Sequence, residues 1–73
     1  MPEIRVKSEI AGSVWKIVKQ PGEAVEAEET LLILESMKME IPVAAPKAGV
    51  LAALHVAEGE AVEEEQLVAV IRA

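Results

Sequence analysis

The chain has 73 residues, a net charge of −6 and no cysteine, and Trp15 is its single aromatic residue. A chain of this length forms one small domain, so we expect residues 1–73 to fold as a unit around an aliphatic core. The lack of cysteine excludes disulfides and thiolate metal sites, and the acidic balance argues against nucleic acid, which needs a basic face. Apolar runs such as residues 50–54 are far too short to span a membrane. No export signal is visible, so we expect a cytoplasmic protein.

The first half of the chain carries a series of strand and turn patterns. Ile4 and Val6 alternate with charged neighbours, which is typical of a half-buried edge strand. Residues 13–18 are rich in β-branched and aliphatic side chains and predict a second strand. Residues 20–23, Gln-Pro-Gly-Glu, predict a turn, because proline presets φ at one position and glycine allows a positive φ at the next. A short strand and the apolar strand 31–34 complete this half.

The second half has the same order of elements. Its expected strands are residues 41–45, 50–56 and 67–71, and its expected turn is residues 57–60. Residues 11–36 align with residues 48–73 without a gap, at a constant shift of 37 positions. Gly-Glu-Ala-Val-Glu, for example, occurs at residues 22–26 and again at 59–63. Because two copies are too few for a solenoid, this repeat predicts a compact domain with quasi-two-fold symmetry.

A unique hexapeptide, Glu-Ser-Met-Lys-Met-Glu at residues 35–40, separates the two copies. The flanking strands place Met37 and Lys38 in a two-residue hairpin loop. Such loops usually contain Asn-Gly or Asp-Gly because φ is positive at both positions, so Met-Lys is a poor choice for stability. Sequence that disfavours its own local structure indicates a functional site. The expected cross-strand pairs are Ser36 with Met39, Glu35 with Glu40 (two like charges) and Leu34 with Ile41.

A lysine at an exposed hairpin tip is suited to covalent modification by another enzyme. A catalytic lysine needs the opposite setting, because it must lose its proton near neutral pH through burial or a cationic neighbour. Met37 and Met39 are flexible and polarizable, which suits a surface that fits more than one partner. Glu35 and Glu40 are either read by such a partner or simply solvate the tip. The plainer interpretation, an ordinary alternation of hydrophobic and polar residues at a strand end, leaves the length and central place of the hexapeptide unexplained.

These residues resemble the biotinyl/lipoyl attachment domain family, and most closely its biotin carboxyl carrier domains and small free-standing biotin/lipoyl attachment proteins. In biotin domains the modified lysine lies in Met-Lys-Met, usually after Glu-Ala or Glu-Ser, as at residues 35–39. The family's downstream Ala-Pro-x-x-Gly is present at residues 45–49. Its two Gly-Asp/Glu turns match residues 22–23 and 59–60, and the likeness covers residues 10–71.

The resemblance implies an all-β fold, a flattened β-barrel or sandwich of two four-stranded antiparallel sheets with quasi-two-fold symmetry (a barrel-sandwich hybrid). The lysine lies at a hairpin turn and the chain ends meet at the opposite end. By the same resemblance, biotin protein ligase joins biotin to Lys38. The arm then carries a carboxyl group between the biotin carboxylase and carboxyltransferase sites of an enzyme such as acyl-CoA carboxylase. The domain has no catalytic residue of its own and binds no metal. Met37 and Met39 are recognition residues, and Glu35, Ser36 and Glu40 are their hairpin context.

The chain departs from the family pattern at two places. Many relatives have a glycine a few residues after each Gly-Asp turn, where this chain has Glu28 and Glu65. Either these positions do not need a positive φ here, or they carry a small strain energy. There is also no insertion between Val18 and Val25, so we expect no protruding "thumb" of the kind found in some bacterial carriers.

Several alternatives stay open beside the biotin carrier. A lipoyl carrier, or one that accepts both cofactors, is the nearest, although lipoyl domains more often have Asp-Lys-Ala at the turn. An unmodified interaction module of the same fold has no use for Met-Lys-Met. An enzyme needs an acid–base pair, and His55, the only histidine, alternates with apolar residues as a solvent-facing strand residue does. The run 63–65 of three glutamates lacks the ligand spacing of a calcium loop and is expected to be a solvated loop. Trp15 is expected to pack against the sheet or to lie partly exposed beside it.

Overall fold

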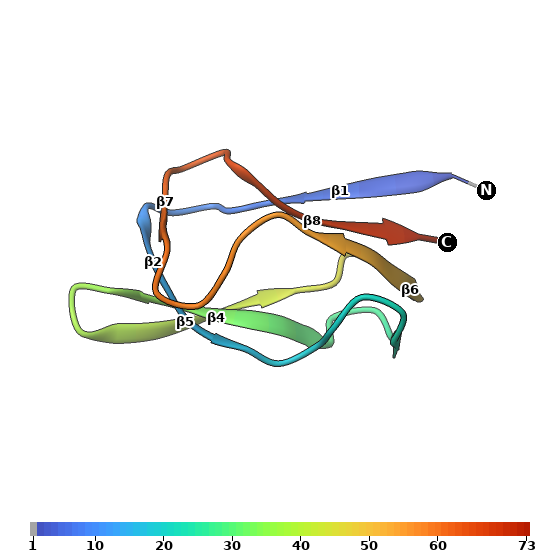
Figure 1. The fold of residues 1–73 in the computed structure, drawn as a ribbon, viewed down its shortest axis with the longest axis horizontal. Coiled ribbons are helices and arrows are strands. Elements are labelled where there is room, and N and C mark those ends of the chain that lie inside the picture. The colour runs from blue at the N-terminus through green and yellow to red at the C-terminus, as the bar shows by residue number, and fades with distance from the viewer. Residues whose placement is uncertain (1) are drawn as a thin grey trace.

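A computed structural model describes residues 2–73 of the chain. These residues form eight strands, which Figure 1 shows as two layers that face each other. The strands are β1 (Glu3–Lys7), β2 (Gly12–Ile17), β3 (Ala24–Val25), β4 (Thr30–Ser36), β5 (Met39–Ala44), β6 (Gly49–Leu54), β7 (Ala61–Val62) and β8 (Leu67–Arg72). The expected strands are therefore present, each with its ends shifted by no more than a few residues.

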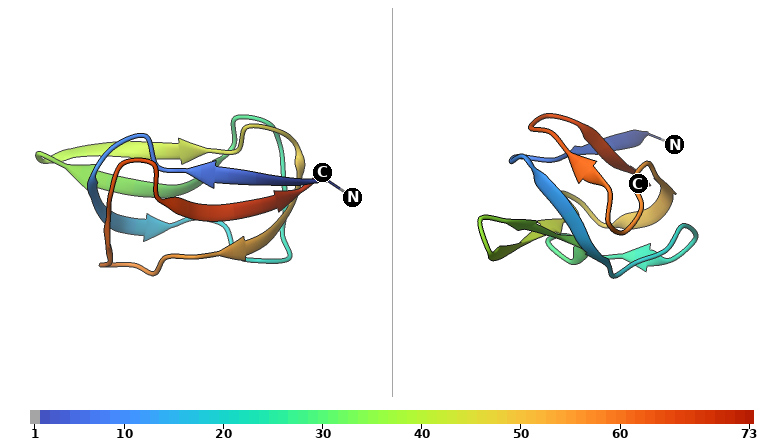
Figure 2. Two further views of the ribbon diagram at one scale, coloured as in Figure 1. Left: turned by 90° about the horizontal axis from the view of Figure 1, so that it is seen from above. Right: turned by 60° about the vertical axis from the view of Figure 1, so that its left-hand side comes forward.

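Each layer is a four-stranded sheet assembled from both halves of the chain. One sheet has the order β1-β8-β6-β3 and the other β5-β4-β2-β7, and every pairing is antiparallel. The chain passes repeatedly between the two layers, as the two views in Figure 2 show. This arrangement confirms the expected all-β sandwich, and β1 lies at a sheet edge as its alternating pattern indicated.

The core lies between the two layers and is entirely aliphatic. The central strands β4 and β8 supply most of its largest fully buried side chains, and the other central strands, β6 and β2, add Leu51 and Val14. Each fully buried Val, Leu or Ile contributes about 1.5–3 kcal/mol of transfer free energy. The buried hydrophobic residues are Val6, Val14, Val25, Leu31, Leu32, Leu34, Val43, Ala45, Leu51, Val56, Val62, Val68, Ala69 and Ile71.

The quasi-two-fold symmetry extends further than the sequence repeat indicated. Adding 37 to the residue numbers of β1 to β4 gives β5 to β8 to within one residue at each end, so the repeat begins at β1 rather than at residue 11. The paired ends Ser36 and Met39, which close the β4–β5 hairpin, then correspond to the two chain ends. The backbone N–H of Ala73 donates to the carbonyl of Pro2 over 3.2 Å, as that correspondence requires. The hairpin turn and the chain ends therefore lie at opposite ends of a molecule about 36 Å long and 18 Å wide, as expected (Figure 1).

The sheet corners contain four turns of four residues each, and all four have the same hydrogen-bonding pattern. In each, the N–H of the third residue donates across to the other half, and the side chain of the fourth residue accepts from the N–H of the first. The third residue has a positive φ of 70–98° in all four turns, which is type II geometry. The turns are residues 20–23, 26–29, 57–60 and 63–66.

The third residue is Gly22 and Gly59 in two of these turns and Glu28 and Glu65 in the other two. Glu28 has φ 70° and Glu65 has φ 72°, so the alternative that these positions do not need a positive φ is wrong. The cross-chain hydrogen bonds explain why the backbone keeps this conformation. The N–H of Glu28 donates to the carbonyl of Ala45 and that of Glu65 to Ser8, each over 2.7 Å. Both glutamates therefore carry the strain of a left-handed L-residue, about 1–2 kcal/mol.

Candidate functional site

The hairpin of β4 and β5 is the most extensively paired unit of the fold. Six residue pairs connect the two strands, and the last three before the turn are Leu34 with Ile41, Glu35 with Glu40, and Ser36 with Met39. This is the register expected from the sequence. Leu34 is fully buried and Ile41 is half-buried, so the base of the hairpin is tied to the core. Burial of this base fixes the register of the hairpin, so the tip lies at the end of a paired ladder that is anchored in the core.

The turn itself has the conformation that its sequence disfavours. Met37 has φ 52° and Lys38 has φ 66°, and a positive φ at both central positions is the mark of a type I′ turn. Glycine and asparagine reach this region at low cost, whereas methionine and lysine do not. The pairing of Ser36 with Met39 leaves only two residues to reverse the chain. The strands therefore impose the turn, and Lys38 is held in one orientation at its outer end.

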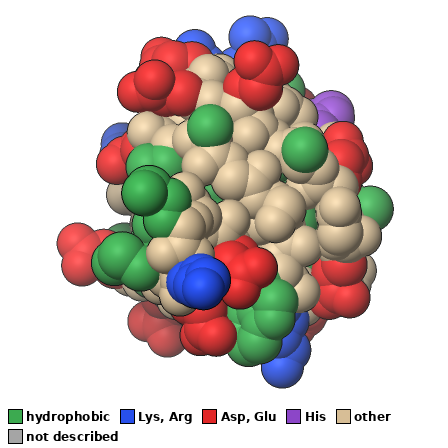
Figure 3. Space-filling view, turned by 90° about the vertical axis from the view of Figure 1, so that its left-hand side faces the viewer, with side chains coloured by type: hydrophobic (Ala, Val, Ile, Leu, Met, Phe, Trp, Pro, Cys, Tyr) green, Lys and Arg blue, Asp and Glu red, His purple; other side chains and the backbone are tan. Residues whose placement is uncertain are grey.

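The side chains of the tip extend into solvent. Met37 is 92% exposed and Met39 is 63% exposed, which are the two largest exposures among the large hydrophobic residues described. Lys38 is exposed too and forms no ion pair with another residue of the described chain. Figure 3 views this end of the molecule, where hydrophobic, acidic and basic side chains lie close together. The Lys38 amine is thus accessible to an active site that covers the tip.

The other residues of the hexapeptide, Glu35, Ser36 and Glu40, lie in the last two residue pairs of β4 and β5 before the turn. Glu35 and Glu40 face each other across the strands and both are exposed, which is the like-charge pair that the register predicted. Ser36 is half-buried beneath the turn. The structure therefore brings together all six residues singled out from the sequence. Their roles in recognition stay predictions.

The remaining candidates lie away from the tip or in solvent. Trp15 is 48% exposed at a bulge in β2, so it lies partly outside the sheet as one of its two expected placements required. His55 is exposed, as expected, but it lies directly after β6 and not within a strand. The glutamates 63–65 lie in an exposed corner turn, in agreement with the sequence. Residues 2–73 contain no group of three or more acidic or histidine side chains able to hold a metal ion. Over the same range, no helix is long and apolar enough to cross a membrane.

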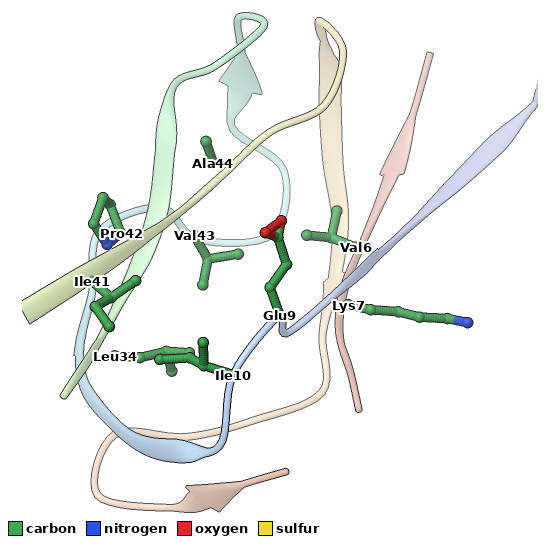
Figure 4. Close-up of a pocket in the computed structure, with 9 residues that line it drawn as sticks. All are labelled: Val6, Lys7, Glu9, Ile10, Leu34, Ile41, Pro42, Val43 and Ala44. Atoms are coloured by element: carbon green, nitrogen blue, oxygen red, sulfur yellow. The ribbon is translucent and has the colours of Figure 1, made fainter. Parts of the chain in front are cut away.

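Sequence reasoning missed a pocket between β1 and β5, the neighbouring edge strands of the two sheets. It has a volume of about 260 Å³ and is bounded at the hairpin side by Ile10, Leu34 and Ile41 (Figure 4). Ile10 lies in the connection from β1 to β2, which carried no strand or turn pattern. An alignment of the two halves that began at β1 would have matched Ile10 to Lys47 and exposed a difference between the copies.

Comparisons with known proteins agree with this geometry. A protein-family model described as "Biotin-requiring enzyme" matches residues 1–71. The "Biotinylated protein TB7.3 homolog" of Mycobacterium leprae is 41% identical over 66 residues, which span 90% of this chain and 93% of the relative. The "Biotin/lipoyl attachment protein" of Bacillus subtilis is 39% identical over 59 residues, 81% of each chain. The crystal structure of the Kluyveromyces lactis urea carboxylase matches with a TM-score of 0.93 and 38% identity, over 99% of this chain and 6% of that one. The chain therefore belongs to the biotin/lipoyl attachment domain family, in which it is a small all-β carrier domain.

Proposed function

We propose that the chain is a biotin carboxyl carrier and that the Nζ of Lys38 is its attachment point. The observation that carries this proposal is the placement of Lys38 at the exposed tip of a rigid type I′ hairpin, between two exposed methionines. An amine at such a tip fits a group joined by an amide, because nothing in the described chain covers it and the ladder below holds it still. The domain supplies position, and the attached group supplies the chemistry.

Attachment replaces the positive charge of the Lys38 amine with a neutral amide. Biotin protein ligase activates the biotin carboxyl group as an adenylate, and Nζ attacks that carbonyl and releases AMP. The new amide bond joins Nζ to the carboxyl carbon of biotin. Met37 and Met39 offer apolar surface to the ligase on both sides of the amine, while Glu35 and Glu40 limit which partner surfaces fit the tip.

The bound biotin carries a carboxyl group from biotin carboxylase to a carboxyltransferase, for example that of an acyl-CoA carboxylase. Both partner sites must accept the tip of the hairpin, which projects from one end of an elongated domain (Figure 1). The opposite end, where the chain ends meet, stays clear of these encounters. A rigid tip lowers the ordering cost of each encounter, because its conformation is already set by the β4–β5 ladder.

A lipoyl carrier is the second candidate, because the same exposed amine fits lipoate and a relative's name gives both groups. The experiment that separates the two is coexpression with a biotin protein ligase and with a lipoyl ligase in turn, followed by intact mass spectrometry. We expect one biotin increment on the wild type, none on Lys38→Arg, and an unchanged increment on the matched control Lys47→Arg. A bare wild-type mass contradicts the carrier proposal. A lipoyl increment without a biotin increment decides for the second candidate.

A further inference from the structure

The pocket between β1 and β5 lies on the same side of the fold as the Lys38 hairpin. Leu34, Val6 and Val43, all buried core residues, contribute to its lining. At its hairpin side are Ile10 and Ile41, which are half-buried and pack at the edge of the core. In Figure 4 the Glu9 carboxylate extends toward the space between Val43 and Val6, while Lys7 points away from the other side chains. The pocket therefore combines an apolar wall with one carboxylate.

A specific local structure presents Glu9 and Ile10 to this pocket. Ser8 is the buried polar residue of the described chain, and its hydroxyl donates to the carbonyl of Ile10 and accepts from the N–H of Ile10 over 3.3 Å. This closed serine turn fixes the connection after β1. In the other half the buried residue at the equivalent position is Ala45, which has no hydroxyl with which to build the same turn.

The quasi-two-fold symmetry supplies a built-in comparison for the pocket. The axis exchanges β1 and β5, so the pocket residues nearer the hairpin have equivalents nearer the chain ends. Where the hairpin side has Ile10 and Pro42, the equivalent positions hold Lys47 and Arg5. Core positions such as Val6 and Val43, by contrast, are the same in both halves. At these two positions the end that bears Lys38 is apolar and the chain end is basic, whereas Glu9, whose equivalent is Pro46, is the charged residue of the hairpin side.

We infer that this pocket, which we name the β1–β5 pocket, binds the ring of the biotinyl group attached to Lys38 between encounters with partner enzymes. The inference rests on the proposed function. Its volume of about 260 Å³ lies just below the roughly 300–1,000 Å³ of typical small-molecule sites, so it suits a fused ring rather than a whole coenzyme.

The Lys38 side chain and the acyl chain of biotin together form an arm long enough to bring the ring from the hairpin tip to the pocket. Ile41 follows Lys38 by three strand positions, which is about 10 Å at roughly 3.3 Å per residue. The lysine stem and the acyl chain of biotin together contain about eleven bonds, each about 1.5 Å long, so even a kinked arm spans more than 10 Å. The ring therefore reaches Ile10 and Ile41 when the arm folds back along β5.

The chemistry of the ring matches the lining. The cyclic urea of biotin has two N–H donors, and Glu9 offers carboxylate oxygens that accept hydrogen bonds. The sulfur-containing ring and the acyl chain are apolar and fit against Ile10, Leu34 and Ile41. A lipoyl group has an apolar ring without N–H donors, so Glu9 distinguishes the two cofactors.

Methyl NMR of the biotinylated chain tests the inference directly. With isoleucine δ1-methyl groups labelled, we expect biotinylation to shift the Ile10 and Ile41 signals and to produce contacts between these methyls and the ring protons. Ile4, the symmetry equivalent of Ile41 near the chain ends, should not shift and is the internal control. Shifts confined to residues 36–39, without ring contacts beyond the turn, overturn the inference.

Capture by avidin provides a second readout, since avidin binds only a ring that is free. A ring bound in the pocket two thirds of the time leaves a third of the arms available, so losing the pocket speeds capture about three-fold. We expect this acceleration in Glu9→Ala, whose side chain is exposed, and in Ile10→Lys. Lys47→Ile, at the symmetry-equivalent position, is the control and should capture at the wild-type rate. Equal rates in all four proteins refute the pocket.

The outcomes separate this inference from the proposed function. A chain that takes no biotin, as read by intact mass, fails the proposed function, and the inference falls with it. A biotinylated chain without the methyl shifts fails the inference alone. A biotinylated chain whose Ile10 and Ile41 shifts do not respond to Glu9→Ala has an apolar pocket without urea recognition, which also refutes the inference as stated.

Discussion

Replacing Met37 with asparagine should raise the stability of the domain while lowering its modification. Met37 has φ 52° and is 92% exposed, so its side chain contributes little to packing and its backbone is strained. An ordinary L-residue in the left-handed region costs about 1–2 kcal/mol, whereas asparagine reaches that region readily and is preferred at this place in a type I′ turn. We therefore expect Met37→Asn to increase the free energy of unfolding by about 0.5–1 kcal/mol, part of the strain that the turn now carries.

The same substitution removes apolar surface that we assign to ligase recognition. Full burial of a methionine side chain contributes about 1.5–3 kcal/mol, and each 1.4 kcal/mol is about ten-fold in a rate or binding constant. The kcat/KM for biotinylation of Met37→Asn should therefore fall at least about ten-fold. Urea unfolding followed by circular dichroism measures the stability, and intact mass spectrometry against time measures the biotinylation.

Met39→Asn is the matched control, because Met39 lies in β5 and pairs with Ser36 without a positive φ. Asparagine is unfavourable in strands, on a scale that spans about 1 kcal/mol, so this variant should be slightly less stable than the wild type. A Met37→Asn protein that is less stable than the wild type refutes the strain argument. One that is biotinylated at the wild-type rate refutes the recognition role of Met37.

Two further predictions concern the corner turns. Glu28→Gly and Glu65→Gly should each stabilise the domain by about 0.5–1 kcal/mol, because the roughly 1–2 kcal/mol of strain that is relieved exceeds the roughly 0.4–1 kcal/mol lost to the greater freedom of glycine in the unfolded chain. Thermal melting measures this change. The control Glu64→Gly, at a neighbouring position without a positive φ, should destabilise the domain. The second prediction concerns pH. A hydrogen bond from Lys19, at 2.8 Å, and one from the backbone N–H of Glu26 lower the pKa of Glu29. Because the folded pKa is the lower one, this stabilisation is present above the unfolded pKa near 4.5 and is lost as the pH falls through the folded pKa. As the pH is lowered, the melting temperature of Lys19→Gln should fall less steeply than that of the wild type. Identical slopes in the two proteins would show that the pair of Lys19 and Glu29 contributes nothing.

The agreement between sequence and structure is best where adjacent residues decide the outcome. The apolar run 31–34 gives a strand, and three of its four side chains are fully buried in the core. Residues 20–23 form their turn because proline and glycine set φ locally. The hairpin register follows from the alternation on either side of Met37 and Lys38, since a slip of one residue would expose Leu34.

Agreement is poorer where distant residues decide the conformation. Nothing local requires Glu28 or Glu65 to adopt a positive φ, and each is held there by a hydrogen bond from the other half of the chain. The repeat was recognised only from residue 11, although β1 and β5 carry the same residue at three equivalent positions, Glu3 and Glu40, Ile4 and Ile41, and Val6 and Val43. That the two strands occupy equivalent sheet edges became visible only when both sheets were assembled, because strand order depends on pairing between distant residues.

The sequence by itself determined the all-β class, the two matched halves, and the place of Lys38 in the turn between them, because strand periodicity and turn chemistry act within a few residues. The tertiary structure alone decided that Met37 and Lys38 are forced into a left-handed turn, and that Ile10 meets Leu34 and Ile41 beside it. The physical reason is that ladder pairing and edge-to-edge packing join residues far apart in the chain, and they override local preferences whose cost is only about 1–2 kcal/mol.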